Sequence, residues 1–228
     1  MIDVDPYPEC SDPGVGYCAY FDSAGAVETV ALHVSRTCSG NAGCLDADAP
    51  ATRDAILAFD GVFFRGGDQS LYVQHWADSE LERAVFDVHA AGGVVGGTSA
   101  GAMIQSPVTS IGDATSFEAT ADPYHPRIEL SDSLFGGQMA LLPPTSLDTH
   151  FTPRARLGRL MVLLGRWAED RGEDLLAIGI DQETAVTVEP DGIATVHGQG
   201  AVSFVQATPE SERTFVPVPS RPEHLVLA

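Results

Sequence analysis

The chain of 228 residues contains no lysine: all 12 of its basic residues are arginine, against 32 acidic ones. The net charge of −20 disfavours binding to nucleic acid or to an anionic membrane, since both are themselves negative. It would favour a cationic substrate, or it reflects only a solvated acidic surface. No apolar run reaches the roughly 18 residues of a membrane-spanning helix. The first residues have neither the basic nor the apolar region of a signal peptide, so none is expected in the sequence as given.

Cysteine is scarce and confined to one end. Cys10, Cys18, Cys38 and Cys44 are the four cysteines of the chain. Their spacing fits no common zinc pattern, so we expect no metal site and no other cofactor. An even number in one irregular segment predicts one or two disulfides and favours an exported protein. The alternative is four reduced thiols in a cytosolic protein, to which the lack of a signal peptide points.

Strands that alternate with helices and a β-rich tail predict an α/β fold with a largely parallel sheet. We expect strands near 27–34, 61–65 and 176–180 and helices near 51–59, 70–76, 79–91 and 152–169. A meander of antiparallel strands is expected from 185 to 218. No repeat or linker is apparent, so residues 1–228 are predicted to be one domain.

Ser99 is the first candidate for chemistry. It lies in Gly97-Thr-Ser-Ala-Gly101, between an apolar run and a helix-compatible run. This is the strand–turn–helix context of a nucleophile elbow, in which a strained turn exposes the serine hydroxyl. We expect a side chain at either glycine to collide with the strand or the helix. The pattern therefore predicts a nucleophilic serine.

A serine nucleophile needs a base and an oxyanion site. His150 is the candidate base, because it lies in a loop that leads directly to a helix. Two backbone amides can hold the oxyanion, that of Ala100 after the serine and that of Gly67 after a buried strand. An ordinary turn is the alternative interpretation of Gly66-Gly67.

Three arginines follow the histidine, Arg154, Arg156 and Arg159. Guanidinium groups suit carboxylates, but cations at a helix N-terminus oppose the helix dipole unless an acidic group faces them. Asp148 is such a partner, or it binds a cationic group of a substrate. Both interpretations are open at this point.

Four blocks of sequence together resemble the cyanophycinases, members of a serine peptidase family that also contains the α-aspartyl dipeptidases. The blocks are Phe64-Arg-Gly-Gly-Asp-Gln69, Gly97-Thr-Ser-Ala-Gly-Ala102, Asp148-Thr-His-Phe-x-x-Arg-x-Arg-x-x-Arg159 and Gly179-Ile-Asp-Gln-Glu-Thr-Ala185. They occur in the family's order over residues 55–190. Residues 1–50 are atypical, because the family's first strand and glycine-rich loop are either shortened or replaced by the cysteine-bearing segment.

The resemblance implies a class I glutamine-amidotransferase-like (flavodoxin-like) sandwich, with a mostly parallel sheet and antiparallel C-terminal strands. It implies Ser99 as nucleophile and His150 as general base. It also implies a substrate pocket lined by Gln69, Asp148, Thr149, Arg154, Arg156 and Arg159. The substrate would be a peptide such as cyanophycin, a polyaspartate backbone with arginine on each side chain, cleaved to β-aspartyl-arginine. A homodimer is implied as well.

One departure affects the catalytic triad. The family has Glu as the triad acid where this chain has Gln182. An amide oxygen can orient the imidazole but cannot stabilise the imidazolium. Glu183 is adjacent, but its side chain should point to the opposite side of an extended chain. Asp181 has the same difficulty.

Three functions follow. The first is a serine-type hydrolase of cyanophycin or β-aspartyl peptides that acts through an acyl-enzyme. The second is a weakened or inactive paralogue that binds β-aspartyl or acidic ligands. The third is another acyl hydrolase or dipeptidase on the same scaffold. Gln182 or Glu183 within hydrogen-bond reach of His150 would complete the triad, whereas neither within reach would favour the second function.

Overall fold

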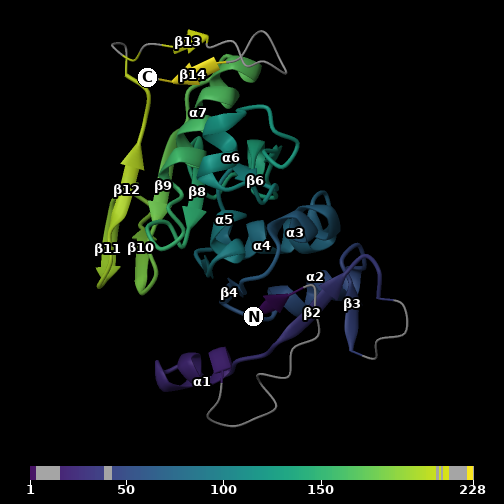
Figure 1. The fold of residues 1–228 in the computed structure, drawn as a ribbon. Coiled ribbons are helices and arrows are strands. Elements are labelled where there is room, and N and C mark those ends of the chain that lie inside the picture. Colours follow the sequence, from purple (N-terminus) through teal and green to yellow (C-terminus); the bar gives the residue numbers. More distant parts are fainter. Residues whose placement is uncertain (4–15, 39–42, 209–210, 212, 216–224, 228) are drawn as a thin grey trace. The chain divides into compact units, whose positions relative to one another are not determined.

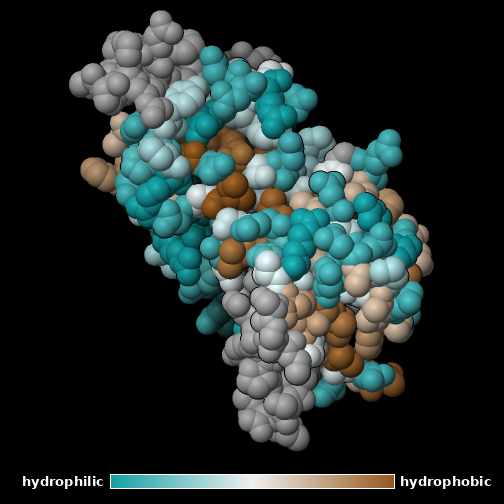
Figure 2. Space-filling model, turned by 90° about the vertical axis from the view of Figure 1, so that its right-hand side faces the viewer, coloured by the Kyte–Doolittle hydropathy of each residue, from teal (hydrophilic) through white to brown (hydrophobic). Residues whose placement is uncertain are grey.

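The computed structural model describes residues 1–3, 16–38, 43–208, 211, 213–215 and 225–227. The chain forms two compact units, Met1–Gln105 with Leu134–Leu141, and Ser106–Ser133 with Leu142–Ala228. Hydrophilic residues cover much of the face shown in Figure 2, as the net charge of −20 predicts. None of the described helices combines the length and apolar composition that crossing a bilayer requires. The single-domain organisation stays a prediction.

The first unit has a parallel sheet in the order β3-β2-β1-β4-β5 (Figure 1). Its strands are β1 (Ile2–Asp3), β2 (Leu32–Ser35), β3 (Cys44–Asp46), β4 (Gly61–Phe64) and β5 (Val94–Gly97). Its helices are α1 (Gly16–Ser23), α2 (Pro50–Leu57), α3 (Gln69–Trp76), α4 (Glu80–Ala90) and α5 (Ala100–Met103), with a short 3₁₀ turn, η1 (Gly137–Met139). The core packs Phe64 of β4 on Trp76 of α3, with ring centroids 5.5 Å apart. This packing fixes α3 against the sheet.

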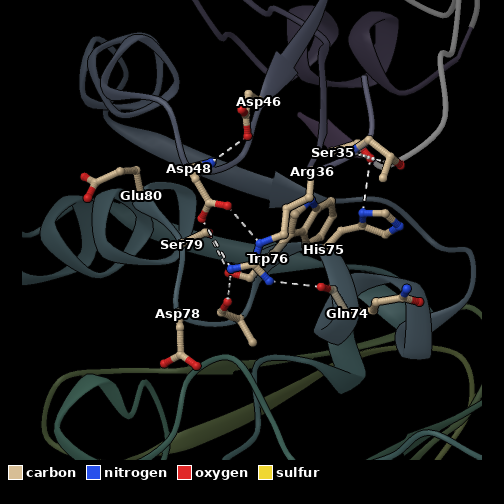
Figure 3. A network of polar contacts seen from close by, with 12 residues as sticks. Ser35, Arg36, Asp46, Asp48, Gln74, His75, Trp76, Asp78, Ser79 and Glu80 are labelled. Atoms are coloured by element: carbon tan, nitrogen blue, oxygen red, sulfur yellow. Dashed lines mark hydrogen bonds and ion pairs between the residues drawn. The ribbon is translucent and has the colours of Figure 1, made fainter. Parts of the chain in front are cut away.

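Arg36, just after β2, ties the end of α3 to the sheet (Figure 3). Its guanidinium donates to Asp48 at 3.0 Å and to the carbonyl oxygens of Gln74 and Ala77. These carbonyls belong to the last turn of α3 and the residue that follows it, where a cation is favourable. The C-terminal end of α3, the helix that begins at Gln69, is thus tied to the sheet.

The second unit has a mixed sheet in the order β12-β9-β8-β6-β7. Its strands are β6 (Val108–Ser110), β7 (Leu130–Asp132), β8 (Thr145–Thr149), β9 (Leu176–Ile180) and β12 (Val202–Val205). β6, β8 and β9 are parallel, and β7 and β12 are antiparallel edges. The helices are α6 (Ser116–Ala121) and α7 (Leu157–Arg171), and α7 packs Leu160 and Trp167 on Ala177 of β9. Two hairpin-like pairs complete the unit, β10 (Thr184–Val188) with β11 (Ala194–Gly198) and β13 (Arg213–Phe215) with β14 (Leu225–Leu227).

The predicted α/β fold with a mostly parallel sheet and antiparallel C-terminal strands is confirmed. The continuous meander is wrong, because β12 leaves the β10–β11 hairpin and pairs with β9. The N-terminal segment, which the sequence predicts to be irregular, begins with the strand β1. Ile2 is 2% exposed, and β1 lies between β2 and β4 at the centre of the first sheet. A strand of two residues is too short to show any periodicity in the sequence.

The cysteines are oxidised where the structure describes them. Cys38 and Cys44 form a disulfide that links the segment after β2 to the start of β3. Cys18 in α1 is disulfide-bonded as well. Cys10 lies outside the described residues. The prediction of disulfides is confirmed at Cys38–Cys44.

Candidate active site

In the first unit, Ser99 lies in a strained turn between β5 and α5. Its backbone has φ 53° and ψ −123°, a conformation that residues with a side chain rarely adopt. α5 begins at the next residue, Ala100, and the Ser99 carbonyl accepts hydrogen bonds from its first turn. The serine side chain remains partly exposed. Strain at a polar, accessible residue is typical of a functional site.

The two glycines that flank Ser99 are required by close backbone contacts. A Cβ on Gly97 would lie 2.2 Å from the carbonyl oxygen of Gly101. A Cβ on Gly101 would lie 2.3 Å from the carbonyl oxygens of both Phe64 and Arg65 at the end of β4. A side chain at either glycine would therefore collide with the backbone, as the Gly-x-Ser-x-Gly pattern predicts.

The loop after β4 runs directly against Ser99. A Cβ on Gly66 would lie 2.9 Å from the Ser99 Cβ and 3.5 Å from its Oγ. In the part of the chain that the structure describes, the amides of Gly67 and Ala100 donate no hydrogen bond. Gln69, two residues beyond Gly67, begins α3 and is partly exposed. The loop and the first turn of α5 thus provide two polarised N–H groups near the serine.

In the second unit, His150 follows the last residue of β8, a strand in which all five residues are buried. The backbone turns there with φ 50°, which brings the imidazole out of the sheet into a partly exposed position. The His150 Nδ1 lies 3.0 Å from the side-chain amide of Gln182, which follows β9 by two residues. The two ring nitrogens are therefore distinguished, since Nδ1 is engaged by Gln182.

This contact is compatible with two tautomers of His150. Either the Gln182 N–H donates to an unprotonated Nδ1, or, with the amide turned over, Nδ1–H donates to the Gln182 Oε1. Only the second arrangement leaves Nε2 unprotonated and able to accept a proton. The amide allows both, whereas a carboxylate, which only accepts, would impose the second.

The surroundings of His150 favour its neutral form. Burial lowers the pKa of the imidazole below its usual value of 6.5, and the charges of Arg154 and Arg156 lower it further. The carboxylate of Asp148 acts in the opposite direction. A neutral imidazole at pH 7 is the form that a general base requires.

Glu183 does not contact His150. Its backbone has φ 54°, its side chain is exposed, and its carboxylate makes no hydrogen bond to any described residue. Its carbonyl oxygen accepts from the Gln199 amide at 3.0 Å. Of the two neighbours named as third members of a triad, Gln182 is the one beside the imidazole.

A buried ion-pair cluster lies beneath the His150 loop. Arg159 grips the two oxygens of Asp148, with Nε to Oδ2 at 2.7 Å and Nη2 to Oδ1 at 2.6 Å. Arg156 donates to Asp148 Oδ1 at 2.8 Å and to the Thr149 carbonyl at 2.6 Å. Asp148 is 1% exposed and Arg159 is 5% exposed. Of the two partnerships open for Asp148 from the sequence, the one with the arginines is the one observed.

Arg154 and Thr149 each have a polar group that no described residue contacts by an ion pair or hydrogen bond. Arg154 is exposed and forms no ion pair with the residues that the structure describes. The hydroxyl of Thr149 is buried and has no hydrogen-bond partner among those residues, although the Thr149 amide donates to Asp148. Thr149 directly precedes His150 in the chain, and Arg154 follows it by four residues.

The helix that follows His150 begins later than the sequence predicts. α7 begins at Leu157, not at Thr152. The Thr152 amide instead donates to the carboxylate of Asp181 at 2.7 Å, and Ala155 has φ 48°, outside the helical region. The Thr-Pro dipeptide, a common start of a helix, is here part of an irregular turn. Arg156 consequently occupies the N-cap position of α7.

Two residues that support the site were not assigned to it from the sequence. The Asp181 carboxylate holds the loop after His150, and the Ser116 hydroxyl, which donates to the Ala155 carbonyl, accepts from the Arg159 amide. Asp181 adjoins Gln182 in a recognised block, which is a usable signal. Ser116 follows Thr115, the N-cap of a capping box with Glu118, and this pattern in the sequence is the signal that locates it.

Comparison with known proteins decides the family. The model of "Peptidase family S51" matches residues 46–196. The chain belongs to peptidase family S51. The matched range includes all of the candidate residues above and excludes the four cysteines, which precede it.

This S51 chain is similar to curated cyanophycinases. It is 28% identical to one of Trichormus variabilis over 198 residues, which are 86% of this chain and 59% of that protein. It is 32% identical to one of Synechococcus elongatus over 163 residues, 69% of this chain and 46% of that protein. The chain thus spans about half to three-fifths of the length of these relatives.

The fold is shared with a solved peptidase structure. A peptidase from an acI-B1 Actinobacterium superposes with a TM-score of 0.50 and 19% identity, over 91% of this chain and 70% of the other. This similarity supports the α/β fold.

Proposed function

We propose that this S51 member is a serine-type hydrolase that cleaves β-aspartyl peptides, cyanophycin among them, through an acyl-enzyme. The observation that carries the proposal is the strained turn at Ser99, flanked by the amides of Gly67 and Ala100 that have no described partner. Such a turn presents a hydroxyl beside donors for a developing oxyanion. Family membership supports the same class of reaction.

In the proposed mechanism, Ser99 Oγ attacks the carbonyl carbon of the scissile bond while His150 Nε2 accepts the hydroxyl proton. The amides of Gly67 and Ala100 donate to the oxyanion of the tetrahedral intermediate. His150 then gives the proton to the leaving amine as the carbon–nitrogen bond breaks, and an ester on Ser99 remains. Water, deprotonated by His150, attacks the ester carbonyl; the bond to Ser99 Oγ then breaks, His150 returns the proton to Oγ, and the product leaves with a new carboxyl group.

Gln182 would take the place of the acid in this mechanism. Its Oε1 accepts from Nδ1–H and keeps the ring oriented, but it adds no charge to stabilise the imidazolium. In a serine protease of the chymotrypsin type, replacing the triad acid by its amide lowers the rate by about 10⁴. We therefore expect a slow enzyme. Glu183 is the weaker candidate for this role, because it is exposed and the hydrogen bond to His150 is made by Gln182.

The resemblance assigns six residues to substrate binding, and we propose different roles for those that form the buried ion-pair cluster and those that do not. Arg154, which has no ion-pair partner among the described residues, is proposed to bind a substrate carboxylate. The Thr149 hydroxyl and Gln69 are proposed to bind polar groups of the substrate, as the resemblance implies. Asp148, Arg156 and Arg159 satisfy one another and are proposed to support the His150 loop from below.

Turnover of cyanophycin by the purified protein tests the proposal. We expect release of β-aspartyl-arginine, and we expect Ser99→Ala to abolish it without a change in thermal stability. Equal release by both proteins would remove Ser99 from the mechanism. A β-aspartyl dipeptide and a simple ester, assayed in parallel, identify another acyl hydrolase on this scaffold.

A second candidate is favoured by one observation, the neutral Gln182 at the Nδ1 of His150. In this alternative the protein binds β-aspartyl or acidic ligands with negligible turnover. It predicts that calorimetry detects tight binding of cyanophycin to the unmodified protein, and that the polymer is recovered uncleaved. The homodimer implied by the resemblance is a further proposal, which light scattering tests.

A further inference from the structure

The turn after β9 is held by the carboxylate of Asp181. Its Oδ1 accepts from the Thr152 amide at 2.7 Å, and its Oδ2 accepts from the Ala201 amide at 3.2 Å. The Asp181 amide in turn donates to the Ala201 carbonyl at 3.1 Å. One carboxylate thus joins three segments: the loop two residues after His150, the turn that carries Gln182, and the chain that enters β12. These hydrogen bonds lower the pKa of Asp181, so that it remains ionised at neutral pH.

The same turn is braced on its other side by Thr184. Its hydroxyl donates to the Gln182 carbonyl at 3.0 Å and accepts from the Gly200 amide at 2.9 Å. Gly200 has no room for a side chain, since a Cβ there would lie 2.5 Å from the Thr184 Oγ1 and 2.7 Å from the Asp181 Cβ. The backbone of Gln182 is therefore fixed by neighbours on both sides.

A neutral third residue makes this bracing important. A hydrogen bond between an imidazole and a carboxylate is roughly twice as strong as one between two neutral groups. In an ordinary triad, the charge of the acid itself helps to hold the histidine. Here the pair is an amide and a neutral imidazole, and Gln182 is exposed. The geometry of the pair must therefore come from the backbones that carry the two side chains.

We propose that Asp181 is a positioning residue that holds His150 against Gln182 by clamping the Thr152 amide. The carboxylate acts through the backbone and touches neither ring nor substrate. The effect on catalysis rests on the proposed function, whereas the effect on the His150 ring does not, and the two can be measured separately.

The test is Asp181→Ala, with Asp191→Ala as the matched control. Asp191 also accepts from a backbone amide, that of Ile193 at 3.0 Å, but it does so in the turn at the opposite end of the β10–β11 hairpin. The pKa of His150 is measured by NMR titration of the ¹⁵N-labelled protein, and kcat and KM are measured with a β-aspartyl substrate.

We expect Asp181→Ala to lower kcat about 10- to 100-fold with a much smaller change in KM, the size typical of a misplaced catalytic group. We expect the His150 pKa to rise toward the usual value, because a loosened loop hydrates the ring. The charges that act on His150 within its unit, Arg154, Arg156 and Asp148, are unchanged in this variant. Asp191→Ala should leave both quantities unaltered.

The direction of the pKa change separates a clamp from a simple charge effect. Removing a nearby carboxylate that acts by its charge would lower the His150 pKa. A fall in the pKa, or an unchanged pKa with unchanged kcat, would therefore overturn the proposal. If the unmodified protein has no hydrolase activity, the proposed function fails, and the NMR titration still decides whether Asp181 is a clamp.

Gly200→Ala provides an independent perturbation should Asp181→Ala not fold. Its new methyl group would push on Asp181 and Thr184 and leave the carboxylate in the chain. We expect the same direction of change, a lower kcat and a higher His150 pKa. A folded Gly200→Ala protein with the His150 pKa and kcat of the unmodified chain would contradict the clamp.

Discussion

Replacing Gln182 by Glu should restore the charge that the His150 pair lacks. The Gln182 amide lies 3.0 Å from Nδ1, so a carboxylate of the same length would reach the Nδ1–H without movement of the backbone. It would impose the tautomer with Nε2 unprotonated, because a carboxylate at neutral pH only accepts. It would also face the imidazolium that forms during the reaction. Both effects increase the rate.

The size of the effect follows from the exposure of the pair. Two unit charges about 4 Å apart attract by roughly 1 kcal/mol in bulk water and by roughly 4 kcal/mol near a protein surface. Gln182 is exposed, which favours the lower part of this range. A stabilisation of about 1–2 kcal/mol raises the pKa of His150 by about one unit, since one unit corresponds to 1.36 kcal/mol. The gain in rate should lie between about 10-fold and the 10⁴-fold seen when a triad acid is replaced by its amide.

The assay is kcat/KM for β-aspartyl-arginine release from pH 5 to 9, with Glu183→Gln as a control that alters a neighbouring carboxyl. In Gln182→Glu, the gain should be largest above pH 7 and smaller at pH 5, because the raised pKa moves the acidic limb to higher pH. Glu183→Gln should change the profile by less than about twofold, since an exposed residue without described contacts contributes little. A Gln182→Glu protein whose rate and acidic limb match those of the unmodified chain would refute the role assigned to this position.

Three further predictions concern the same region. First, the acidic limb of kcat/KM should lie below pH 6.5, because burial and the flanking arginines lower the pKa of free His150; a limb above pH 6.5 would contradict this. Second, Asp148→Asn should lower the free energy of unfolding in urea by about 3–5 kcal/mol, because it leaves the guanidinium of Arg159 buried without a counter-charge. A loss below about 1 kcal/mol would show that the cluster is relaxed or hydrated. Third, Gly101→Ala should fold poorly or melt at a much lower temperature, because its Cβ would lie 2.3 Å from two carbonyl oxygens; an unchanged melting temperature would argue against the close packing of α5 on β4.

Features that depend on local sterics could be predicted from the sequence. The turn at Ser99 is an example, because the positions of Gly97 and Gly101 are dictated by atoms within a few residues or by the adjacent strand. The strand Leu176–Ile180 was predicted with the bounds that the structure shows, since five apolar or small residues between polar segments indicate a buried strand. The pairing of Gln182 with His150 followed from family resemblance.

Features that depend on contacts between distant segments could not be predicted from the sequence. The start of α7 was predicted at Thr152, because the sequence does not show that Asp181 would claim the Thr152 amide. The partner of β12 is another such case, since strand spacing alone favoured its neighbour in sequence over β9. The pairing of Asp148 with Arg156 and Arg159 stayed open for the same reason, because the sequence does not tell whether a carboxylate faces its own chain or a ligand.

Under the proposed function, the charges around His150 would let a carboxylate of the substrate replace the missing triad acid. Arg156 and Arg159 share one carboxylate, and Arg154 has none among the described residues, so this part of the chain is locally cationic in a protein of net charge −20. That excess lowers the pKa of free His150 and opposes formation of the imidazolium. A substrate carboxylate bound at Arg154 would cancel part of it and supply the negative charge that Gln182 lacks. The pKa obtained from kcat, which reports the enzyme–substrate complex, should then exceed that obtained from kcat/KM, which reports the free enzyme. Arg154→Gln should reduce this difference while it raises KM; equal pKa values in both profiles would show that the substrate contributes no charge to His150.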